Sequence, residues 1–235
     1  MRVSEESFAP PAAPAARPRW RHRGYPLKRP LDLLGSLTLA VVLSPLILGV
    51  ALLVWWKDGG PVIYKSERMR APGQPFLLWK FRTMRPDPGD HGVSGGHKQE
   101  RITPTGRALR RRRLDELPQL WNVFRGEMSL VGPRPPLRRY VEDHPDLYAE
   151  VLRVKPGITG LATLAYCRAE EEILGACRSA QEADAVYARR CVPRKARLDR
   201  IYERHQGLCY DFWLMFVTVR RSLPMSPGRH RPPRN

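Results

Sequence analysis

The stretch LDLLGSLTLAVVLSPLILGVALLVWW, residues Leu31–Trp56, decides the architecture of this chain. Asp32 is its only charged side chain. At about 1.5 Å of rise per residue, a helix of this length can cross a hydrocarbon core of roughly 30 Å. The remaining sequence is too short to cover such a helix on every face, so we expect the run to lie in a bilayer rather than in a soluble core.

Both flanks of this run are basic, and its middle is broken. Lys and Arg tend to stay on the cytoplasmic side of a membrane, so both ends are expected there. Ser44-Pro45 lies at the centre, where proline removes a backbone donor and bends or breaks a helix. These observations predict a re-entrant helix, with a single kinked transmembrane helix as the alternative. The basic residues are Arg17, Arg19, Arg21, Arg23, Lys28 and Arg29 before the run and Lys57, Lys65, Arg68 and Arg70 after it.

The whole chain is strongly basic, with 41 Lys and Arg against 23 Asp and Glu and a net charge of +18. Such a charge favours polyanionic partners: an anionic membrane surface, phosphate-bearing substrates or nucleic acid. The 4 Cys and 6 His are scattered, without the close spacing of a zinc site or a disulfide framework. We therefore assign no metal-binding or redox role to them.

Downstream of the apolar run, the pattern predicts one helix-rich α+β domain with a small β-hairpin. Residues 61–64 and 75–81 are rich in β-forming side chains, and Pro72-Gly73 between them is typical of a turn. The polar stretch from Arg85 to Arg101 contains several Pro and Gly residues and is expected to form a loop.

The rest of this domain is predicted to be largely helical. A helix is expected to begin near Asp115, and helical spacing returns between Glu170 and Arg204. The apolar run Cys209–Val219 is too short to cross a bilayer, so it is either core or a second contact with the membrane surface. The predicted units are a basic Pro/Ala-rich disordered tail at 1–27, the re-entrant helix at 28–57, one folded domain at 58–221 and a second disordered tail at 222–235.

Asp115-Glu116 is the pair of residues best suited to chemistry. It follows the basic run Arg110–Arg113 and opens a predicted helix, so positive charge and helix N–H groups would surround the carboxylates. Such surroundings keep Asp115 ionised, as a nucleophile requires. The alternative is that Asp115 merely caps the helix while the arginines face solvent.

The pair belongs to a series of motifs, of which the longest is LDELPQLWNVFRGEMSLVGPRP at Leu114–Pro135. Together they resemble the bacterial sugar transferase family, the monotopic phosphoglycosyl transferases, from about Lys28 to Val219. Several motifs in one order seldom arise by chance, so the series is more specific than any one of them. The others are KRPLDL at Lys28–Leu33, the Ser44-Pro45 break, GPV at 60–62, KFRTM at Lys80–Met84 and KPGITGL at Lys155–Leu161.

The resemblance implies an enzyme that transfers a sugar-1-phosphate from a UDP-sugar to a polyprenol phosphate such as undecaprenyl phosphate. Asp115 matches the family's nucleophile, which forms a covalent phosphosugar-aspartate and releases UMP. Glu116 matches the neighbouring carboxylate that helps to hold Mg²⁺. Residues 58–221 would then be the catalytic domain, facing the cytosol at the bacterial cytoplasmic membrane, in the minimal, monotopic form of the family.

Phosphoryl transfer needs converging positive charge, and the motifs contain four basic candidates for binding substrate phosphates and nucleotide. Arg suits bidentate phosphate contacts, and Pro133 would stiffen the loop that carries Arg134. Anionic lipids are expected partners of the basic flanks, and a homodimer is left open. The four candidates are Lys80, Arg82, Arg110 and Arg134, with Arg134 placed first and Arg82 last.

The chain departs from the commonest family pattern after Gly160, where Leu161–Glu171 replaces the usual Trp-Ala-Gln-Val-Asn-Gly continuation. The identity of the sugar therefore does not follow from the resemblance, nor does the glycan, which would be an exopolysaccharide, an O-antigen or a glycoprotein glycan. A nucleic-acid-binding protein and a membrane scaffold are the alternative functions. The first leaves the apolar run unexplained and the second leaves the Asp-Glu pair unexplained, so we expect no nucleic-acid partner.

Overall fold

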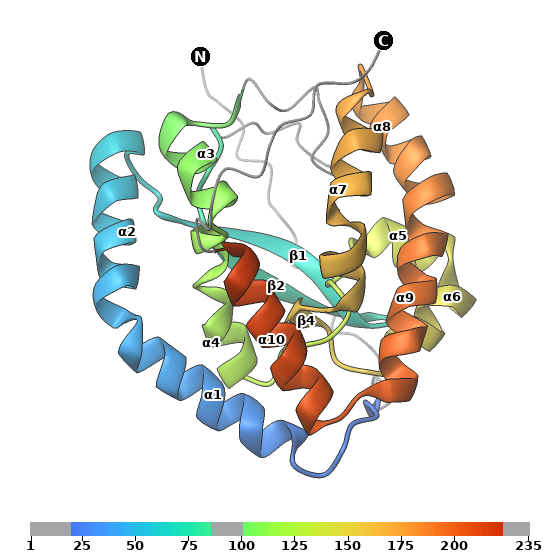
Figure 1. Ribbon diagram of the computed structural model, residues 1–235. Helices are drawn as coiled ribbons and strands as arrows, with labels where there is room; N and C mark the ends of the chain where they lie inside the picture. Colours follow the sequence, from blue (N-terminus) through green and yellow to red (C-terminus); the bar gives the residue numbers. More distant parts are fainter. Residues whose placement is uncertain (1–19, 86–100, 223–235) are drawn as a thin grey trace, which may run out of the picture.

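The computed structural model of the protein describes residues 20–85 and 101–222 (Figure 1). Within these ranges it is a helix-rich α+β fold with two small sheets and a bent pair of N-terminal helices, which confirms the predicted fold class. The predicted loop between Arg85 and Arg101 and most of the two predicted tails lie outside the described residues.

The bent pair consists of α1, Lys28–Val42, and α2, Ser44–Asp58, which meet at 62°. Pro45 occupies the first turn of α2, where its missing N–H costs no helical hydrogen bond. The Ser44 hydroxyl donates to the Val41 carbonyl at 2.7 Å. The predicted break is therefore confirmed. No single helix in the described ranges is long and apolar enough to cross a membrane, whereas the two helices taken together are.

The outer surface of this pair is strongly apolar. Figure 1 shows α1 and α2 wrapped round the outside of the molecule, with the bend at one corner. Leu34, Val42, Leu48 and Trp56 keep between 61% and 75% of their surface exposed. A continuous apolar surface of this kind marks contact with lipid or with another apolar partner.

Lys28, at the start of α1, attaches the pair to the rest of the molecule. Its buried ammonium group donates to Asp211 at 2.6 Å, on helix α10 (Leu208–Ser222). It also donates to the Val131 carbonyl at 3.0 Å and to the Tyr202 hydroxyl at 3.1 Å. Buried charges are tolerated when they are paired and hydrogen-bonded, so this network fixes the position of α1.

Asp32, one turn further along α1, makes the second attachment. Its carboxylate accepts hydrogen bonds from the Ser129 hydroxyl and the Leu130 amide, both at 2.9 Å. These residues belong to strand β3, Ser129–Val131. The single charge of the apolar run is thus a buried structural group that joins α1 to the sheet.

The predicted hairpin is present as β1, Ile63–Ala71, and β2, Gln74–Phe81, which pair antiparallel around Pro72-Gly73. Gly73 has φ +67°, a conformation that glycine adopts without strain. The first strand is longer than the predicted run at 61–64. Phe76 and Leu78 of β2 contribute to the main core, together with Leu120, Val123, Met128, Leu130, Val131, Val154, Tyr202 and Leu214.

A second sheet pairs β3 in parallel with β4, Gly157–Thr159. The backbones come very close beyond these strands, because the Gly132 amide donates to the Thr159 carbonyl at 2.8 Å. A Cβ atom on Gly132 would lie 2.1 Å from the Lys155 carbonyl oxygen, so only glycine fits there. This approach fixes the loop that follows Gly132.

The remaining elements are helical and cover the sheets. The predicted helical region between Glu170 and Arg204 is confirmed, with a break between α7 and α8. The run Cys209–Val219 lies in α10, where Leu214 is buried and Phe216 is exposed. The elements are α3 (Pro104–Arg111), the 3₁₀ turn η2 (Leu114–Glu116), α4 (Gln119–Phe124), α5 (Arg138–Asp143), α6 (Pro145–Val151), α7 (Leu161–Gly175), α8 (Ala180–Val186), the π-helical turn η3 (Tyr187–Cys191) and α9 (Val192–His205).

Part of the segment predicted as an N-terminal tail is packed against the body. The Trp20 indole donates to the Leu152 carbonyl at 2.9 Å, and the His22 ring contacts the same oxygen at 3.1 Å. The tail predicted at 1–27 therefore does not extend to these residues, because the Pro/Ala-rich composition belongs to the earlier ones, whereas Trp20 and His22 contact Leu152, which is distant in the sequence.

We expect Lys28→Met to lower the free energy of unfolding by about 3 kcal/mol, because it leaves Asp211 buried without its ammonium partner. Thermal unfolding of the detergent-solubilised protein measures this loss as a lower Tm. The double variant Lys28→Met/Asp211→Leu should recover part of it. A double variant less stable than Lys28→Met would show that the unpaired charge is not the cause.

Candidate active site

Asp115 and Glu116 lie in the short turn η2 rather than at the start of a long helix. Arg113 adopts a left-handed conformation, φ +56°, and so separates α3 from η2. The next helix, α4, begins only at Gln119, after Pro118. The predicted helix start near Asp115 is thus present as a 3₁₀ turn, the α-helix itself begins four residues later, and the two carboxylates are held by this tight turn and neighbouring cations.

Glu116 is buried and is shared by three cations. Its Oε1 atom accepts from Lys80 on β2 and from Arg134 in the loop after β3, both at 3.2 Å. Its Oε2 atom accepts from Arg113 at 2.8 and 3.2 Å. Burial alone would raise the pKa of Glu116, but the charges of Lys80, Arg134 and Arg113 outweigh it and hold that pKa well below its usual range.

Asp115 is also buried, with 8% of its surface exposed. Burial raises the pKa of Asp115 and the adjacent Glu116 raises it further, while Lys80, Arg110 and Arg134 partly oppose this shift. This rise in the pKa of Asp115 is opposite to the sequence prediction, which took account of the nearby cations but not of the burial of the carboxyl group. Of the two carboxyl groups, Glu116 is the strongly stabilised anion and Asp115 the more basic one.

The other predicted site residues lie at different distances from this pair. Arg110, near enough for its charge to act on Asp115, donates from Nε to the Thr83 hydroxyl at 2.9 Å. Pro133 is fully buried, and its carbonyl accepts from the Gly157 amide at 2.8 Å, which fixes the loop leading to Arg134.

Arg82 is directed away from the pair, to the C-terminal end of α2. Its guanidinium donates to the carbonyl groups of Asp58, Gly59 and Gly60, the last at 2.7 Å. These carbonyls have no partners within α2, because the helix ends there. A phosphate-binding role for Arg82 stays a prediction, because the contacts that its guanidinium makes here cap the end of α2.

Arg68 is a further neighbour of this site, although its place in the sequence indicates only a basic residue that flanks the apolar run. It lies on the same face of the hairpin as Lys80, because Tyr64 pairs with Lys80 and side chains alternate along a strand. Its Nη1 atom is buried without a hydrogen-bond partner among the described residues. Burial and the charge of Arg134 lower the pKa of Arg68 to about 10. The strand register could have shown that Arg68 and Lys80 share a face, but this register is known only once the pairing of β1 with β2 is known.

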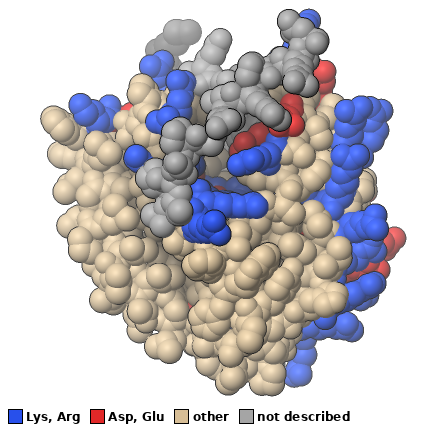
Figure 2. Space-filling view, in the orientation of Figure 1, with Lys and Arg blue, Asp and Glu red and all other residues tan. Residues whose placement is uncertain are grey.

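One face of the molecule combines a basic cluster with a broad uncharged area. Figure 2 shows Lys and Arg gathered near the middle of one face, above a broad area almost without charged residues. In the same orientation, Figure 1 shows α1, α10 and α2 in this uncharged area. The exposed apolar side chains of this area include Leu34 and Val42 of α1, Trp56 of α2 and Phe216 of α10.

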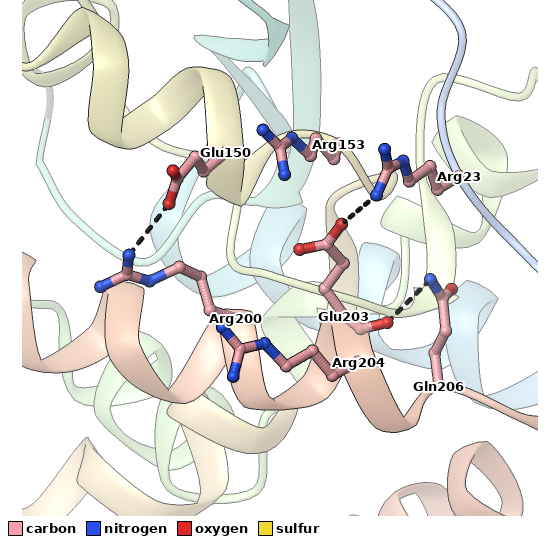
Figure 3. Close-up of a pocket in the computed structure, with 7 residues that line it drawn as sticks. All are labelled: Arg23, Glu150, Arg153, Arg200, Glu203, Arg204 and Gln206. Atoms are coloured by element: carbon pink, nitrogen blue, oxygen red, sulfur yellow. Dashed lines mark hydrogen bonds and ion pairs between the residues drawn. The ribbon is translucent and has the colours of Figure 1, made fainter.

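A polar hollow of about 320 Å³ lies elsewhere, between α6, α9 and the segment before α1 (Figure 3). Its two acidic side chains are already in ion pairs, because Glu150 contacts Arg200 at 2.9 Å and Glu203 contacts Arg23 at 3.4 Å. No residue of the Asp115–Glu116 pair lines it, so it forms no part of this site.

A family model described as bacterial sugar transferase matches residues 23–224, and thus includes the bent helices, the carboxylate pair and the basic loop. The chain belongs to the bacterial sugar transferase family. Relatives in this family include a UDP-glucose:undecaprenyl-phosphate glucose-1-phosphate transferase of Klebsiella pneumoniae, which is 38% identical over 69% of this chain and 36% of its own length.

Two further sugar transferase relatives differ in their names. A UDP-N-acetylgalactosamine-undecaprenyl-phosphate N-acetylgalactosaminephosphotransferase of Aeromonas hydrophila is 32% identical over 84% of this chain and 44% of its own length. The exopolysaccharide production protein ExoY of Rhizobium meliloti is 39% identical over 68% of this chain and 76% of its own length. The chain therefore spans less than half the length of the Klebsiella and Aeromonas relatives.

We expect Glu116→Gln to lower the free energy of unfolding by about 3 kcal/mol at pH 7, because the loss of this buried anion leaves three partly exposed cations without their shared partner. Since the folded-state pKa of Glu116 is depressed, its contribution is present above the unfolded-state pKa of about 4.3 and disappears as the pH falls through the folded-state value. Thermal unfolding at pH 7 and pH 3 tests the loss of stability and its pH dependence, because the difference between the variant and the unchanged protein should be smaller at pH 3.

The matched control for this measurement is Glu142→Gln, which removes an exposed carboxylate 3.5 Å from Arg138. Its effect should stay within about 0.5 kcal/mol. Equal stability of the Glu116→Gln variant and the unchanged protein at pH 7 would contradict the proposed charge arrangement.

Proposed function

We propose that this sugar transferase moves a sugar-1-phosphate from a UDP-sugar to a polyprenol phosphate, undecaprenyl phosphate in bacteria, and releases UMP. The observation that carries the proposal is the buried Asp115–Glu116 pair within a group of cations. The names of the relatives support the same donor and acceptor classes, with either glucose or N-acetylgalactosamine as the sugar. Exopolysaccharide assembly is the pathway that the Rhizobium relative favours.

The charge balance of the site fits a pyrophosphate. The carboxylates of Asp115 and Glu116 are accompanied by a larger number of cationic side chains: Lys80, Arg113 and Arg134 on Glu116, and Arg110 and Arg68 beside them. A surplus of partly buried positive charge is costly without an anionic partner. The phosphates of a nucleotide-sugar would supply that partner and would satisfy the buried Nη1 of Arg68.

Asp115 is the group that we assign to covalent catalysis. In the first step, its carboxylate oxygen attacks the sugar-bearing phosphorus of the donor, and the bond from that phosphorus to the bridging oxygen of UMP breaks. In the second step, an oxygen of the polyprenol phosphate attacks the same phosphorus and releases Asp115 as a carboxylate. The raised pKa of Asp115 makes it a more basic attacker than an exposed Asp.

The carboxylate pair offers oxygen ligands that suit Mg²⁺, although no group of three or more metal-ligating side chains occurs in the described ranges. Mg²⁺ is commonly bound through one or two carboxylates together with substrate phosphates, so Asp115 and Glu116 fit this type of site. When bound, the ion would neutralise charge on the pyrophosphate. Glu116 would then contact the ion in addition to Lys80 and Arg134, which donate to it at 3.2 Å. Lys80 and Arg134 would also contact the phosphates.

The location that we propose is the cytosolic face of the bacterial cytoplasmic membrane, with α1 and α2 entering and leaving from the same side. Exposed basic residues, such as Arg21, Lys57 and Lys65, flank both ends of this pair, and anionic lipids attract an exposed Lys or Arg near the surface by about 1 kcal/mol. A site at this boundary can receive a soluble nucleotide-sugar and a lipid phosphate together.

Purified protein with Mg²⁺, undecaprenyl phosphate and a panel of UDP-sugars should release UMP with at least one donor, and Asp115→Asn should abolish the release. A coupled assay for UMP measures both results. Unchanged release by Asp115→Asn would exclude the covalent mechanism. The absence of release with every donor would contradict the proposed reaction.

The rate of the first step should fall as the pH is lowered, because only the ionised Asp115 attacks. The midpoint of this acidic limb should lie above the ordinary Asp pKa of about 3.9, because the pKa of Asp115 is raised. Arg134 lowers the pKa of Asp115, so Arg134→Gln should move this acidic limb to higher pH, whereas the exposed Arg138→Gln should not. The pH dependence of the UMP burst measures the limb. An identical limb in Arg134→Gln would contradict the charge coupling.

A further inference from the structure

Helix α7 contains the segment Leu161–Glu171, in which the chain departs from the commonest family pattern. The start of this helix is fixed against the loop that carries Arg134. A Cβ atom on Gly160, directly before α7, would lie 2.1 Å from the carbonyl oxygen of Gly132, two residues before Arg134. Helix α7 and the site cation Arg134 therefore extend from one close contact between two backbones.

The charge of Arg134 links this helix to the carboxylate pair. Its guanidinium donates to Glu116 of η2 at 3.2 Å. Glu116 raises the pKa of Arg134 most, burial opposes this rise, and Glu170 of α7 adds to it. Burial raises the pKa of Cys167, one turn before Glu170, whereas the charge of Arg113 lowers it. The face of α7 that carries Cys167 and Glu170 is therefore directed toward two cations that hold Glu116.

Glu170 is held firmly, yet one of its oxygen atoms is available. Its Oε2 atom accepts from Lys195 of α9 at 2.7 Å, and the same ammonium group donates to the Tyr187 hydroxyl at 3.3 Å. The side chain of Lys195 is 9% exposed and that of Glu170 is 25% exposed. No group within residues 20–85 and 101–222 donates a hydrogen bond to the Oε1 atom of Glu170. Solvent or a ligand can therefore reach a carboxylate with a fixed position.

A further carboxylate in this place does not suit phosphate binding, because it repels an anionic pyrophosphate. It suits hydroxyl groups, because a carboxylate accepts short and strong hydrogen bonds from O–H donors. In a UDP-sugar, the sugar is bonded to the phosphorus that Asp115 would attack, so it must lie close to the cations around the pair. The sugar also carries more hydroxyl groups than the ribose.

We propose that Glu170 binds hydroxyl groups of the donor's sugar and thereby contributes to sugar selection, with Lys195 as the residue that positions it. The inference rests on the proposed function and assigns a contact to the part of the donor that differs between relatives. A carboxylate at this position favours a neutral sugar and disfavours one with a carboxylate of its own, because like charges repel.

The test compares a UDP-sugar with UMP, because UMP contains the ribose and a phosphate but not the sugar. Glu170→Gln keeps the size of the side chain and an oxygen that can accept from Lys195. It should lower kcat/KM for the preferred UDP-sugar by about tenfold or more, because a charged hydrogen-bond acceptor is replaced by a weaker neutral one. The Kd of UMP, measured by calorimetry, should stay within about twofold of that of the unchanged protein.

The matched control is Glu172→Gln, which removes an exposed carboxylate two residues further along the same helix and should leave both values unchanged. Glu170→Asp is the second variant. It keeps the charge beside Lys195 but withdraws the carboxylate by one methylene, so it should lower kcat/KM and spare UMP binding even if Glu170→Gln does not fold. Thermal unfolding of each variant checks its folding.

Unchanged kcat/KM in both Glu170 variants would overturn the assignment. An equal loss of UMP binding and of kcat/KM would also overturn it, because Glu170 would then act on the nucleotide or through Arg134. A preference of the unchanged protein for a UDP-uronic acid would contradict the selection of neutral sugars. The absence of UMP release by the unchanged protein with every donor would contradict the proposed function instead.

Discussion

The buried contacts of Lys28 and Asp32 determine how the rest of the molecule is arranged. Both are buried charged groups of α1, and they bind α10 and β3 respectively. Arg29, which donates to the Val123 and Phe124 carbonyls, adds a third polar attachment of α1. Because β3 leads directly into the loop that carries Arg134, the attachment of α1 also sets the position of a site cation. The exposed apolar surface and the carboxylate pair thus share one support.

The site itself depends on a different balance, between burial and charge. Glu116 is saturated by three cations and remains an anion, whereas Asp115, one residue earlier, gains basicity from the same burial. Adjacent carboxyl groups whose pKa values move in opposite directions are suited to different roles. The tight turn η2 makes this division possible, because it presents both side chains to one group of cations from β2, α3 and the loop after β3.

Much of this could be predicted from the sequence, and the failures have physical causes. The hairpin, the break at Ser44-Pro45 and the meeting of Lys80 and Arg134 with Glu116 followed from local patterns and motif resemblance. The helix predicted to start near Asp115 begins there only as a 3₁₀ turn, and neither this turn nor the left-handed Arg113 before it can be recognised from spacing. Arg68 was missed because its relation to Lys80 depends on strand register, and the inward role of Asp32 depends on the distant β3.

Arg82 connects the end of α2 to the strand that carries Lys80. Arg82 follows Lys80 by two residues on the same chain, and its guanidinium is bonded to the last carbonyls of α2. A tilt of α2 would therefore be transmitted to the strand that presents Lys80 to Glu116. Bilayer thickness is a common cause of helix tilt. Lipid composition would then act as a regulator of the enzyme as well as its surroundings.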